Sequence, residues 1–334
     1  MAHKWLEDEG YIATEEELER LEAEIHAIFH NAAIDAEITA RKYLETFLAA
    51  DEEMRKKVIN GEITQSDYIN WRRTKILTAE RYREMANTIS IDLLQYKMVA
   101  SSIINGHLPE IYAININYLT YRIEHGARID TSFTLYNHFA VERIFRDNPN
   151  LLPFTRINPL DSVAWDKKSI NSVIAQSIIK GDSIDEIAAS LQRVAEMDEK
   201  QAIRNARTAT TSAQNAGRLD AMKRVQGMGA TVEKMWIATL DGRTRHAHIA
   251  LDGQTQPLDK PFDSEYGEIM YPGDPSADPA NVYNCRCSLI NQDVRFPVDA
   301  SDLSLRYDDN LGGMTYDEWK HSKDNEARFD NPAY

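Results

Sequence analysis

Apolar residues recur at helical spacing along the first part of the chain. Leu18, Leu21, Ile25 and Ile28 follow one another three or four positions apart, which places them on one face of an α-helix. Around this stripe the chain is strongly acidic, since residues 7–24 contain nine Asp and Glu but a single Arg. The pattern predicts a long helix with a solvated charged face; a docking surface is the alternative interpretation of those charges.

A second apolar stripe predicts another long helix over residues 66–105, after a break at residues 60–61. A glycine behind the last helical turn and a proline beyond it are typical of helix ends. We therefore expect Gly106 and Pro109 to end this helix. Two long helices in succession favour an antiparallel pair or an extended arm.

Aromatic residues are concentrated between residues 111 and 145. Aromatics interleaved with Asn can form a base-stacking surface, but such surfaces also use Arg and Lys, which are missing at residues 114–118. We therefore interpret the aromatic residues as core and subunit contacts. Thr131 is expected to cap a helix that runs through Val141.

The pattern changes in the second half of the chain. Three prolines with Asn-Pro turns predict a hinge at residues 147–168, after which helical spacing resumes and continues to about residue 226. Residues 231–239 alternate between apolar and polar side chains and predict a strand, and residues 288–290 predict the last one. The expected class is α+β and mostly α, with long N-terminal helices, a small α/β module of short strands and an extended C-terminal tail.

These boundaries divide the chain into four predicted segments. They are a helical N-terminal domain or arm (1–146), the Pro-rich hinge (147–168), the α/β module (169–290) and an acidic, extended tail (291–334). From Asp299 onward the tail carries nine acidic and four basic residues. We expect it to cross to another subunit or to be disordered by itself.

The 334-residue chain has a formal net charge of −15. A general nucleic-acid coat would be basic, so any contact with DNA must be local. No apolar run approaches the roughly 18 residues of a transmembrane helix, the acidic start lacks the apolar region of a signal peptide, and no membrane anchor is expected. Two cysteines in a chain of this length favour synthesis in a reducing cytoplasm over a disulfide framework.

The two cysteines, Cys285 and Cys287, are one residue apart. On a strand this spacing points both sulfurs to the same face. With His248 as a third ligand, the set suits a structural zinc ion, which prefers four N, S or O ligands in a tetrahedron. The usual second Cys-x-x-Cys pair is missing, so two buried packing thiols are the alternative. Candidates for the fourth ligand are His246, Asp241 and Asp252.

Charged residues surround His248 in the sequence, namely Asp241, Arg243, Arg245 and Asp252. In an enzyme such a set would combine a base with an arginine clamp for a phosphate. The same residues can also form an ion-paired network that fixes loops around a small core. Because the chain shows no nucleophile motif and no phosphate-cradling glycine loop, we favour the structural interpretation.

One predicted helix is locally basic. Residues 201–225 contain a single acid and five bases, which are Arg204, Arg207, Arg218, Lys223 and Arg224. Arg207 and Arg218 are eleven positions apart, about three helical turns, so they are predicted to share a face that could follow a DNA backbone. A solvated or intersubunit salt-bridge face is the alternative.

Several of these motifs occur together and in a particular order. They are Ala206-Arg207-Thr208 with Asn215 and Arg218, then Trp236, Asp241, Arg243-Thr244-Arg245, His248 and Leu251-Asp252-Gly253, then Tyr271-Pro272-Gly273-Asp274 and Asn284-Cys285-Arg286-Cys287. Over roughly residues 170–290 this pattern resembles the Mu F-like head-morphogenesis proteins, which are minor capsid proteins of tailed bacteriophages. The resemblance makes six residues the structural signature of the module: Trp236, Asp241, Arg243, Arg245, Asp252 and Asn284. His246 departs from the motif by adding a second histidine.

The resemblance implies a noncatalytic virion component that is made in the host cytoplasm and resides in the head interior or at the portal vertex. Its expected partners are the portal protein, capsid or scaffold proteins, and locally the viral DNA. It would assist head assembly and the packaging or ejection of the genome. The alternatives are a DNA-binding module, or a metal-dependent enzyme such as a nuclease or an ADP-ribosyltransferase-like protein, although the tail is shorter than an ordinary domain.

Overall fold

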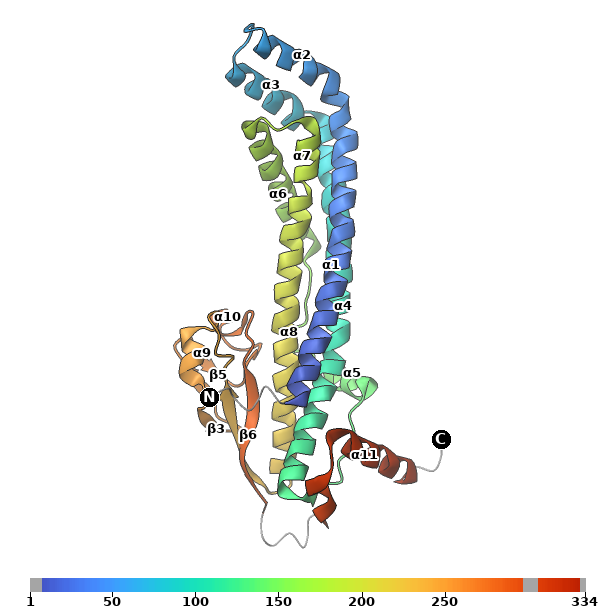
Figure 1. Cartoon of the computed structure of the whole chain (residues 1–334), viewed down its shortest axis with the longest axis vertical. Coiled ribbons are helices and arrows are strands. Elements are labelled where there is room, and N and C mark those ends of the chain that lie inside the picture. The colour runs from blue at the N-terminus through green and yellow to red at the C-terminus, as the bar shows by residue number, and fades with distance from the viewer. Residues whose placement is uncertain (1–7, 297–305, 331–334) are drawn as a thin grey trace. The chain divides into compact units, whose positions relative to one another are not determined.

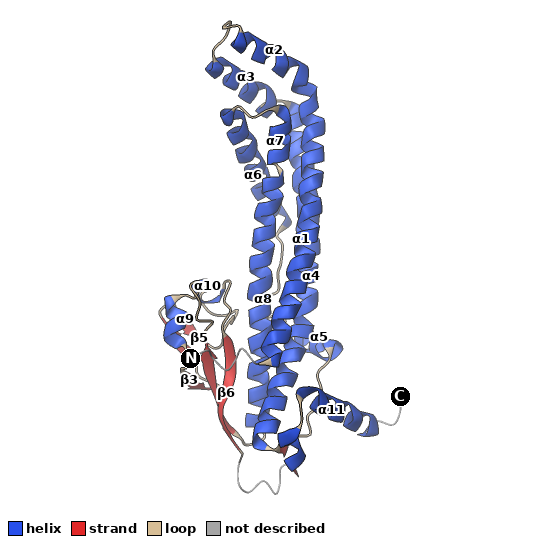
Figure 2. Ribbon diagram, viewed as in Figure 1, coloured by secondary structure: helices blue, strands red, loops and turns tan. Residues whose placement is uncertain are grey.

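The computed structural model of the chain describes residues 8–296 and 306–330, with side chains up to residue 324. Its helices are α1 (Glu9–Leu44), η2 (Glu45–Phe47), α2 (Leu48–Ile59), α3 (Gln65–Leu77), α4 (Glu80–Ala127), α5 (His138–Asp147), α6 (Pro159–Lys180), α7 (Ile184–Ser190), α8 (Gln192–Gly227), α9 (His246–Leu251), α10 (Pro279–Val282), η3 (Asp309–Gly313) and α11 (Tyr316–Asp330). The strands are β1 (Ile129–Asp130), β2 (Thr231–Ile237), β3 (Thr255–Pro257), β4 (Phe262–Ser264), β5 (Gly267–Ile269), β6 (Ser288–Arg295) and β7 (Arg306–Tyr307). The predicted class, α+β and mostly α, is confirmed (Figure 2).

The chain forms two compact units, each built from separate stretches of sequence. Unit 1 draws on residues 8–21, on residues 104–154 and on the described residues from 204 onward. Unit 2 comprises residues 22–103 and 155–203. The long helices α1, α4 and α8 contribute residues to both units (Figure 1). Each unit combines stretches from more than one of the four segments predicted from the sequence. The boundaries of those segments stay a prediction.

Unit 2 is helical, and its polar contacts lock the short helices α2 and α3 in place. The break predicted at residues 60–61 is present as the turn between these two helices, where Gly61 has a φ of +74°. Arg72 of α3 is fully buried. Its Nε donates to Asp51 of α2 at 2.9 Å, and its Nη1 donates to the main-chain oxygen of Asp182 at 2.7 Å. One guanidinium therefore joins α2, α3 and the turn before α7.

The helix predicted over residues 66–105 is two helices, and the second runs much farther than expected. A short turn separates α3 from α4, and α4 then passes through Gly106 and Pro109 without a break. The prediction that these two residues end the helix is wrong. A proline in a helix interior costs roughly 3 kcal/mol because it removes a main-chain hydrogen bond. Buried side chains on both sides of it, such as Leu108 and Ile111, hold the helix together.

The aromatic stretch builds the core of unit 1, as predicted. Its buried members are Tyr112, Tyr118, Tyr121, Phe133 and Phe145. The ring of Tyr112 meets that of Phe145 edge to face, with 5.4 Å between their centroids. Because these rings are enclosed by protein, they are not available for stacking on bases.

Thr131 does not cap a helix, so that prediction is wrong. Its N–H and hydroxyl both donate to the buried carboxylate of Glu124, at 2.9 and 2.5 Å. The helix that follows, α5, begins only at His138 and is capped by the side chain of Asn137. A buried carboxylate that needs hydrogen bonds thus outweighs the local capping preference of the threonine.

The strands of unit 1 form a small antiparallel sheet in the order β3-β2-β6, beside a two-stranded hairpin of β4 and β5. Both predicted strands, at residues 231–239 and 288–290, are confirmed by β2 and β6. Trp236 of β2 pairs with Leu289 of β6. Because β6 lies at the edge of the sheet, its outward main-chain groups need partners from another element.

The C-terminal segment was expected to be extended or disordered, but its described part ends in a helix that packs on unit 1. Trp319 of α11 is completely buried in a cluster with Tyr121 and Phe133. Its Nε1 donates to Glu124 at 2.7 Å, and Lys323 lies 3.3 Å from the same carboxylate. For the described residues the expectation of an extended or disordered tail is wrong, because the acidic composition does not reveal the tryptophan and the lysine that dock the helix. Contact of the tail with another subunit stays a prediction.

Replacing Trp319 with Ala should release α11 from unit 1. The change removes the largest side chain of its cluster, and large-to-small substitutions of this kind cost about 3–5 kcal/mol. We expect chemical denaturation to show a loss of that size and limited proteolysis to cut the C-terminal segment much faster. The matched control is Lys320→Ala on the same helix, where the side chain is 41 % exposed. Equal protease resistance of both variants would contradict the assigned docking.

Unit 2 also contains a buried group of three charges. Lys97 donates to both carboxylate oxygens of Asp166 at 2.7 Å and lies 3.3 Å from Asp198. Lys97 is therefore matched by Asp166, while Asp198 is a second acid without a cation of its own. Burial and the neighbouring charge of Asp166 raise the pKa of Asp198 from 3.8 to about 6.

This group should make stability depend on pH in a specific direction. Because the folded state holds the Asp198 proton more tightly than the unfolded state, protonation of Asp198 stabilises the folded protein below about pH 4. This stabilisation is lost as the pH rises through about 6. We expect Asp198→Asn to stabilise the protein by up to about 3 kcal/mol at pH 7 and by less at pH 5. Urea unfolding at both pH values measures this.

The control is Asp166→Asn, which takes the hydrogen-bonded partner away from buried Lys97. It should destabilise the protein by about 3–5 kcal/mol. If Asp198→Asn were as harmful as Asp166→Asn, Asp198 would not be the surplus acid.

Candidate metal centre and the signature residues

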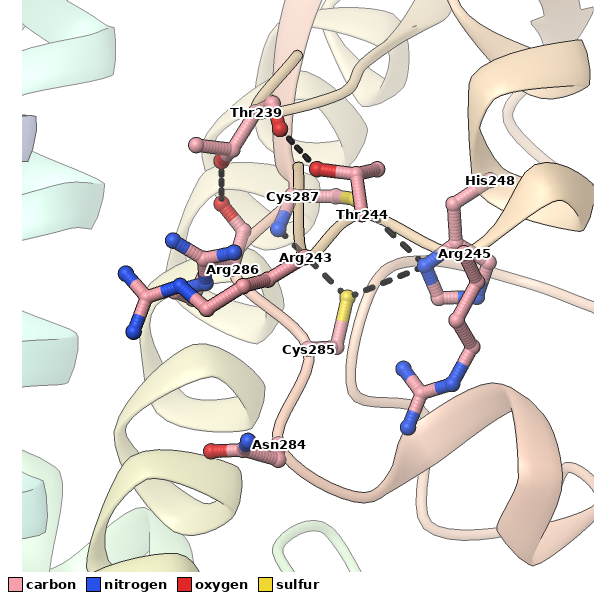
Figure 3. Close-up of a pocket in the computed structure, with 9 residues that line it drawn as sticks. All are labelled: Thr239, Arg243, Thr244, Arg245, His248, Asn284, Cys285, Arg286 and Cys287. Atoms are coloured by element: carbon pink, nitrogen blue, oxygen red, sulfur yellow. Dashed lines mark hydrogen bonds between the residues drawn. The ribbon is translucent and has the colours of Figure 1, made fainter. Parts of the chain in front are cut away.

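Three ligand-type side chains that the sequence singled out meet in unit 1. His248, Cys285 and Cys287 are all buried, and their ligand atoms lie within 4.8 Å of one another. Nδ1 of His248 is 3.5 Å from each of the two sulfurs. Figure 3 shows both sulfurs turned toward this ring nitrogen. The predicted proximity of the three residues is therefore present in the fold.

Two short elements deliver these side chains. His248 lies on α9, the six-residue helix between β2 and β3. The cysteines lie on the segment that leads into β6, and the N–H of Cys287 donates to the Cys285 sulfur at 3.4 Å. Hydrogen bonds with Cys287 and His248 lower the pKa of the Cys285 thiol well below its ordinary value, although burial opposes this. The bond with Cys285 and burial raise the pKa of the Cys287 thiol.

Trp236 forms the apolar wall of the cluster. It is fully buried on β2, and its ring meets those of His248 and Phe262 edge to face, with centroids 5.3 and 5.4 Å apart. Lys234, two positions earlier, is buried on the same face of the strand. Its ammonium donates to the main-chain oxygens of Leu258 and Met270, and burial lowers its pKa to about 8. These contacts hold the loops after β3 and β5 against the sheet.

Asp241 and Arg286 form the strongest ion pair near the cluster. Nη1 and Nη2 of Arg286 donate to the two oxygens of the Asp241 carboxylate, at 2.6 and 2.8 Å. The carboxylate also accepts from the N–H of Arg243 at 2.9 Å. These bonds hold the pKa of Asp241 well below its usual range. The pair fixes the loop after β2 to the residue between the two cysteines.

The other signature residues act on the main chain. Asp252 accepts from the N–H of Ala238 at 2.8 Å, and Arg245 donates to the main-chain oxygen of Tyr283. Asn284 has a φ of +56°, a left-handed conformation that Asn adopts more readily than most residues. Arg243 is exposed, 3.7 Å from Asp241. The geometry is that of a network that fixes loops.

Several of these residues border one small pocket that reaches the cluster. Its lining consists of Thr239, Arg243, Thr244, Arg245, His248, Asn284, Cys285, Arg286 and Cys287 (Figure 3). Three arginines make its walls positive, and one of them is neutralised by Asp241. His246, the extra histidine of the sequence, is exposed and does not belong to the lining.

Helix α8 holds the cysteine segment through a row of polar side chains. Thr208 accepts from the N–H of Asn284 at 3.0 Å, and Thr211 donates to the main-chain oxygen of Cys285 at 2.5 Å. Asn215 bonds in both directions: its amide donates to the Cys287 oxygen at 3.1 Å, and its oxygen accepts from the N–H of Leu289 at 2.7 Å. The edge of β6 is thereby satisfied by a helix.

Arg218 completes this row, and its predicted role in facing DNA is wrong. Only 1 % of the residue is exposed. It donates to Asp8 at 2.7 and 3.1 Å, to Asn115 at 2.8 Å and to the main-chain oxygen of Leu289 at 3.1 Å. A buried guanidinium requires this number of partners because an unpaired charge in the interior is costly.

The remaining bases of α8 do not form one continuous stripe. Arg204 and Lys223 are exposed, and Lys223 lies 3.7 Å from Asp220. Arg207 is half-buried, and Arg224 stacks on the ring of Phe133 with 5.1 Å to its centroid. Contact of these four residues with DNA stays a prediction. Because Arg218 is buried, the predicted face shared by Arg207 and Arg218 does not support contact with DNA.

Sequence reasoning missed three kinds of residue here. Thr211 and the acid that neutralises Arg218, Asp8, were not singled out, because their partners are 74 and 210 positions away in the chain. Gly273 stands within the Tyr271-Pro272-Gly273-Asp274 motif, whose residue types do not reveal its role. A side chain there would meet the main chain of Ser212 at 2.7 Å, and its φ is +83°. The only available signal was the spacing of Thr208, Thr211, Asn215 and Arg218, which puts them on one face of α8.

Arg218→Gln should therefore lower stability rather than DNA affinity alone. Removing the guanidinium leaves Asp8 buried without its cation, and breaking such a pair costs about 3–5 kcal/mol. Lys223→Gln on the same helix is the control and should change stability by no more than about 0.5 kcal/mol. Urea denaturation of both variants measures the difference. A fully stable Arg218→Gln variant would show that the buried pair is unimportant.

Comparison with known proteins supports the module predicted from the motifs. Residues 168–290 match the family described as Phage Mu protein F like protein. The chain is 26 % identical over 277 residues to the Minor head protein GP7 of Bacillus phage SPP1, which covers 79 % of this chain and 83 % of that one. No solved structure matches the chain. Among the described helices, none combines the length and apolar character needed to cross a lipid bilayer.

A second relative has a different name. The chain is 27 % identical over 258 residues to the NAD(+)--arginine ADP-ribosyltransferase EFV of Enterococcus faecalis. The match covers 73 % of this chain but 49 % of that protein, so the chain spans about half of its length.

Proposed function

Because this chain belongs to the Mu F-like family of phage head proteins, we propose that it is a noncatalytic minor capsid protein that binds the portal protein inside the head. In this role it assists head assembly and the packaging or ejection of the viral DNA. The similarity to a minor head protein over most of both chains carries the proposal. Assembly begins in the host cytoplasm and leaves the protein in the virion.

The charge distribution favours a protein partner over DNA. The net charge is −15, and nine of residues 7–24 are acidic against a single Arg. On the basic stretch of α8, Arg218 is buried against Asp8 and Lys223 lies beside Asp220. DNA binding draws most of its affinity from Lys and Arg that face phosphates. A chain with this excess of negative charge suits contact with a protein instead.

Unit 2 offers a candidate surface for that partner. Asp35 of α1 accepts from the hydroxyl of Tyr96 of α4, and Tyr43 of α1 packs near Tyr82 of α4. From the first contact to the second, the residue number on α1 rises from 35 to 43 while the residue number on α4 falls from 96 to 82, so the two helices run antiparallel here. We define the α1/α4 apolar surface by five side chains that are 40–59 % exposed: Ile34, Ile38, Ile91, Met98 and Val99.

Helical geometry places these residues on the exposed faces of the two helices. At 100° per residue, Ile34 and Ile38 share one face of α1, and Ile91 and Met98 share one face of α4 with Val99 at its border, while the buried Ala36 and Leu93 lie on the opposite faces. Exposed apolar side chains that gather in one place are typical of protein–protein contacts. We therefore propose that the α1/α4 apolar surface binds the portal protein.

The test is direct binding of the purified chain to the portal protein of the same phage. We expect co-sedimentation of the wild type, and at least about tenfold weaker binding after Ile38→Lys or Val99→Lys, because a charge in an apolar interface loses its hydration. The matched control is Ile179→Lys on α6, where the isoleucine is 58 % exposed but outside the surface.

Two outcomes would overturn this assignment. Absence of wild-type binding to the portal protein would remove the partner. Equal weakening by Ile38→Lys and Ile179→Lys would remove the surface.

The similarity to an arginine ADP-ribosyltransferase favours a second candidate, transfer of ADP-ribose to arginine. The same preparation tests it through incubation with labelled NAD+ and agmatine. We expect no labelled product, since the signature residues Asp241, Arg245 and Asp252 are engaged in holding the main chain and its loops. Labelled product would contradict the noncatalytic assignment.

A further inference from the structure

We propose that His248, Cys285 and Cys287 bind one zinc ion through Nδ1 and the two sulfurs, with the fourth coordination position filled from solvent. The proposal concerns the interior of unit 1 and does not depend on which head protein the chain contacts. Among the described residues, these three are the His, Cys, Asp or Glu side chains that come together closely enough to hold a metal.

The distances fit zinc. Bonds of about 2.3 Å to sulfur and 2.0–2.1 Å to nitrogen, at the tetrahedral angle, place a sulfur and a nitrogen ligand about 3.5 Å apart. Both Cys285 and Cys287 have their sulfurs 3.5 Å from Nδ1 of His248. An ion between the three atoms would need little movement of side chains. Thiolate and imidazole ligands together select zinc over magnesium or calcium.

The charges of the ligands also suit an ion. His248, Cys285 and Cys287 are all enclosed by protein. A zinc ion neutralises two thiolates, so both cysteines can be ionised in a buried site without net charge. With Nδ1 on the metal, the proton of the imidazole ring occupies Nε2.

The acids proposed as a fourth ligand have other tasks in the structure. Asp241 accepts from Nη1 and Nη2 of Arg286, and Asp252 accepts from the N–H of Ala238. His246 is exposed and outside the pocket lining. The pocket that borders the three ligands is the remaining approach, and the arginines on its walls favour an oxygen ligand such as water or hydroxide.

The ion would join parts of the module that share no element. His248 belongs to α9, whereas the cysteines belong to the segment held by Thr208, Thr211 and Asn215 of α8. Such a bond substitutes for an apolar core in a region of short strands and turns, where little surface is available for burial. Zinc binding therefore contributes to the stability of the module.

The experiment uses the full chain purified under reducing conditions. Elemental analysis should find about one zinc per chain. Replacement by cobalt should give an intense thiolate-to-cobalt absorption band in the near ultraviolet with the d–d bands of a tetrahedral site. Chelation should lower the melting temperature. His248→Ala and Cys285→Ser should bind zinc at least about tenfold more weakly, as expected for loss of a ligand.

His246→Ala is the matched control, because it removes the neighbouring histidine that lies outside the pocket. It should keep the full zinc content and the cobalt spectrum. The cobalt spectrum of the reduced wild type decides the matter even if a ligand variant does not fold. Absence of the thiolate band, or equal zinc in wild type and a Cys285→Ser/Cys287→Ser variant, would overturn the site. Loss of metal in His246→Ala would overturn the solvent ligand.

Discussion

The main chain at residues 284–289 depends on the polar side chains that α8 presents to it. Thr208, Thr211, Asn215 and Arg218 are spaced by three or four positions and bond five main-chain groups of this segment. The segment leads into an edge strand, whose outward N–H and C=O groups would otherwise be buried without partners. Because these bonds fix the backbone, they also fix where the two cysteine sulfurs point.

Buried charges make these contacts depend on residues from distant parts of the chain. Arg218 cannot lie under β6 unless its charge is met, and Asp8 meets it from a position near the start of the chain. Glu124 plays the corresponding role for α11, through bonds with Trp319 and Lys323. In an acidic chain, several bases are thus used internally. Burial thereby removes Arg218 from the surface that the basic stretch of α8 offers.

The two proposals assign different tasks to the two units. Unit 2 presents a surface of exposed apolar side chains on α1 and α4, which suits contact with another head protein. In unit 1 most of the signature residues bind loops and main-chain groups around the His248–Cys285–Cys287 cluster, whereas Arg243 is exposed. These two tasks are consistent with a structural protein, in which the motif preserves a fold rather than a reaction.

The sequence by itself determined the class, the positions of β2 and β6 and the proximity of His248 to the cysteines, because these depend on periodicity and on motifs within about fifty residues. Tertiary structure decided the rest. Packing carried α4 through Pro109, burial turned Arg218 inward, and Trp319 folded an acidic tail into a docked helix. In each case the local conformational preference is worth up to about 3 kcal/mol, and the free energy gained by burying side chains is of similar or greater size. Such contacts join residues too distant in sequence for any local pattern to reveal.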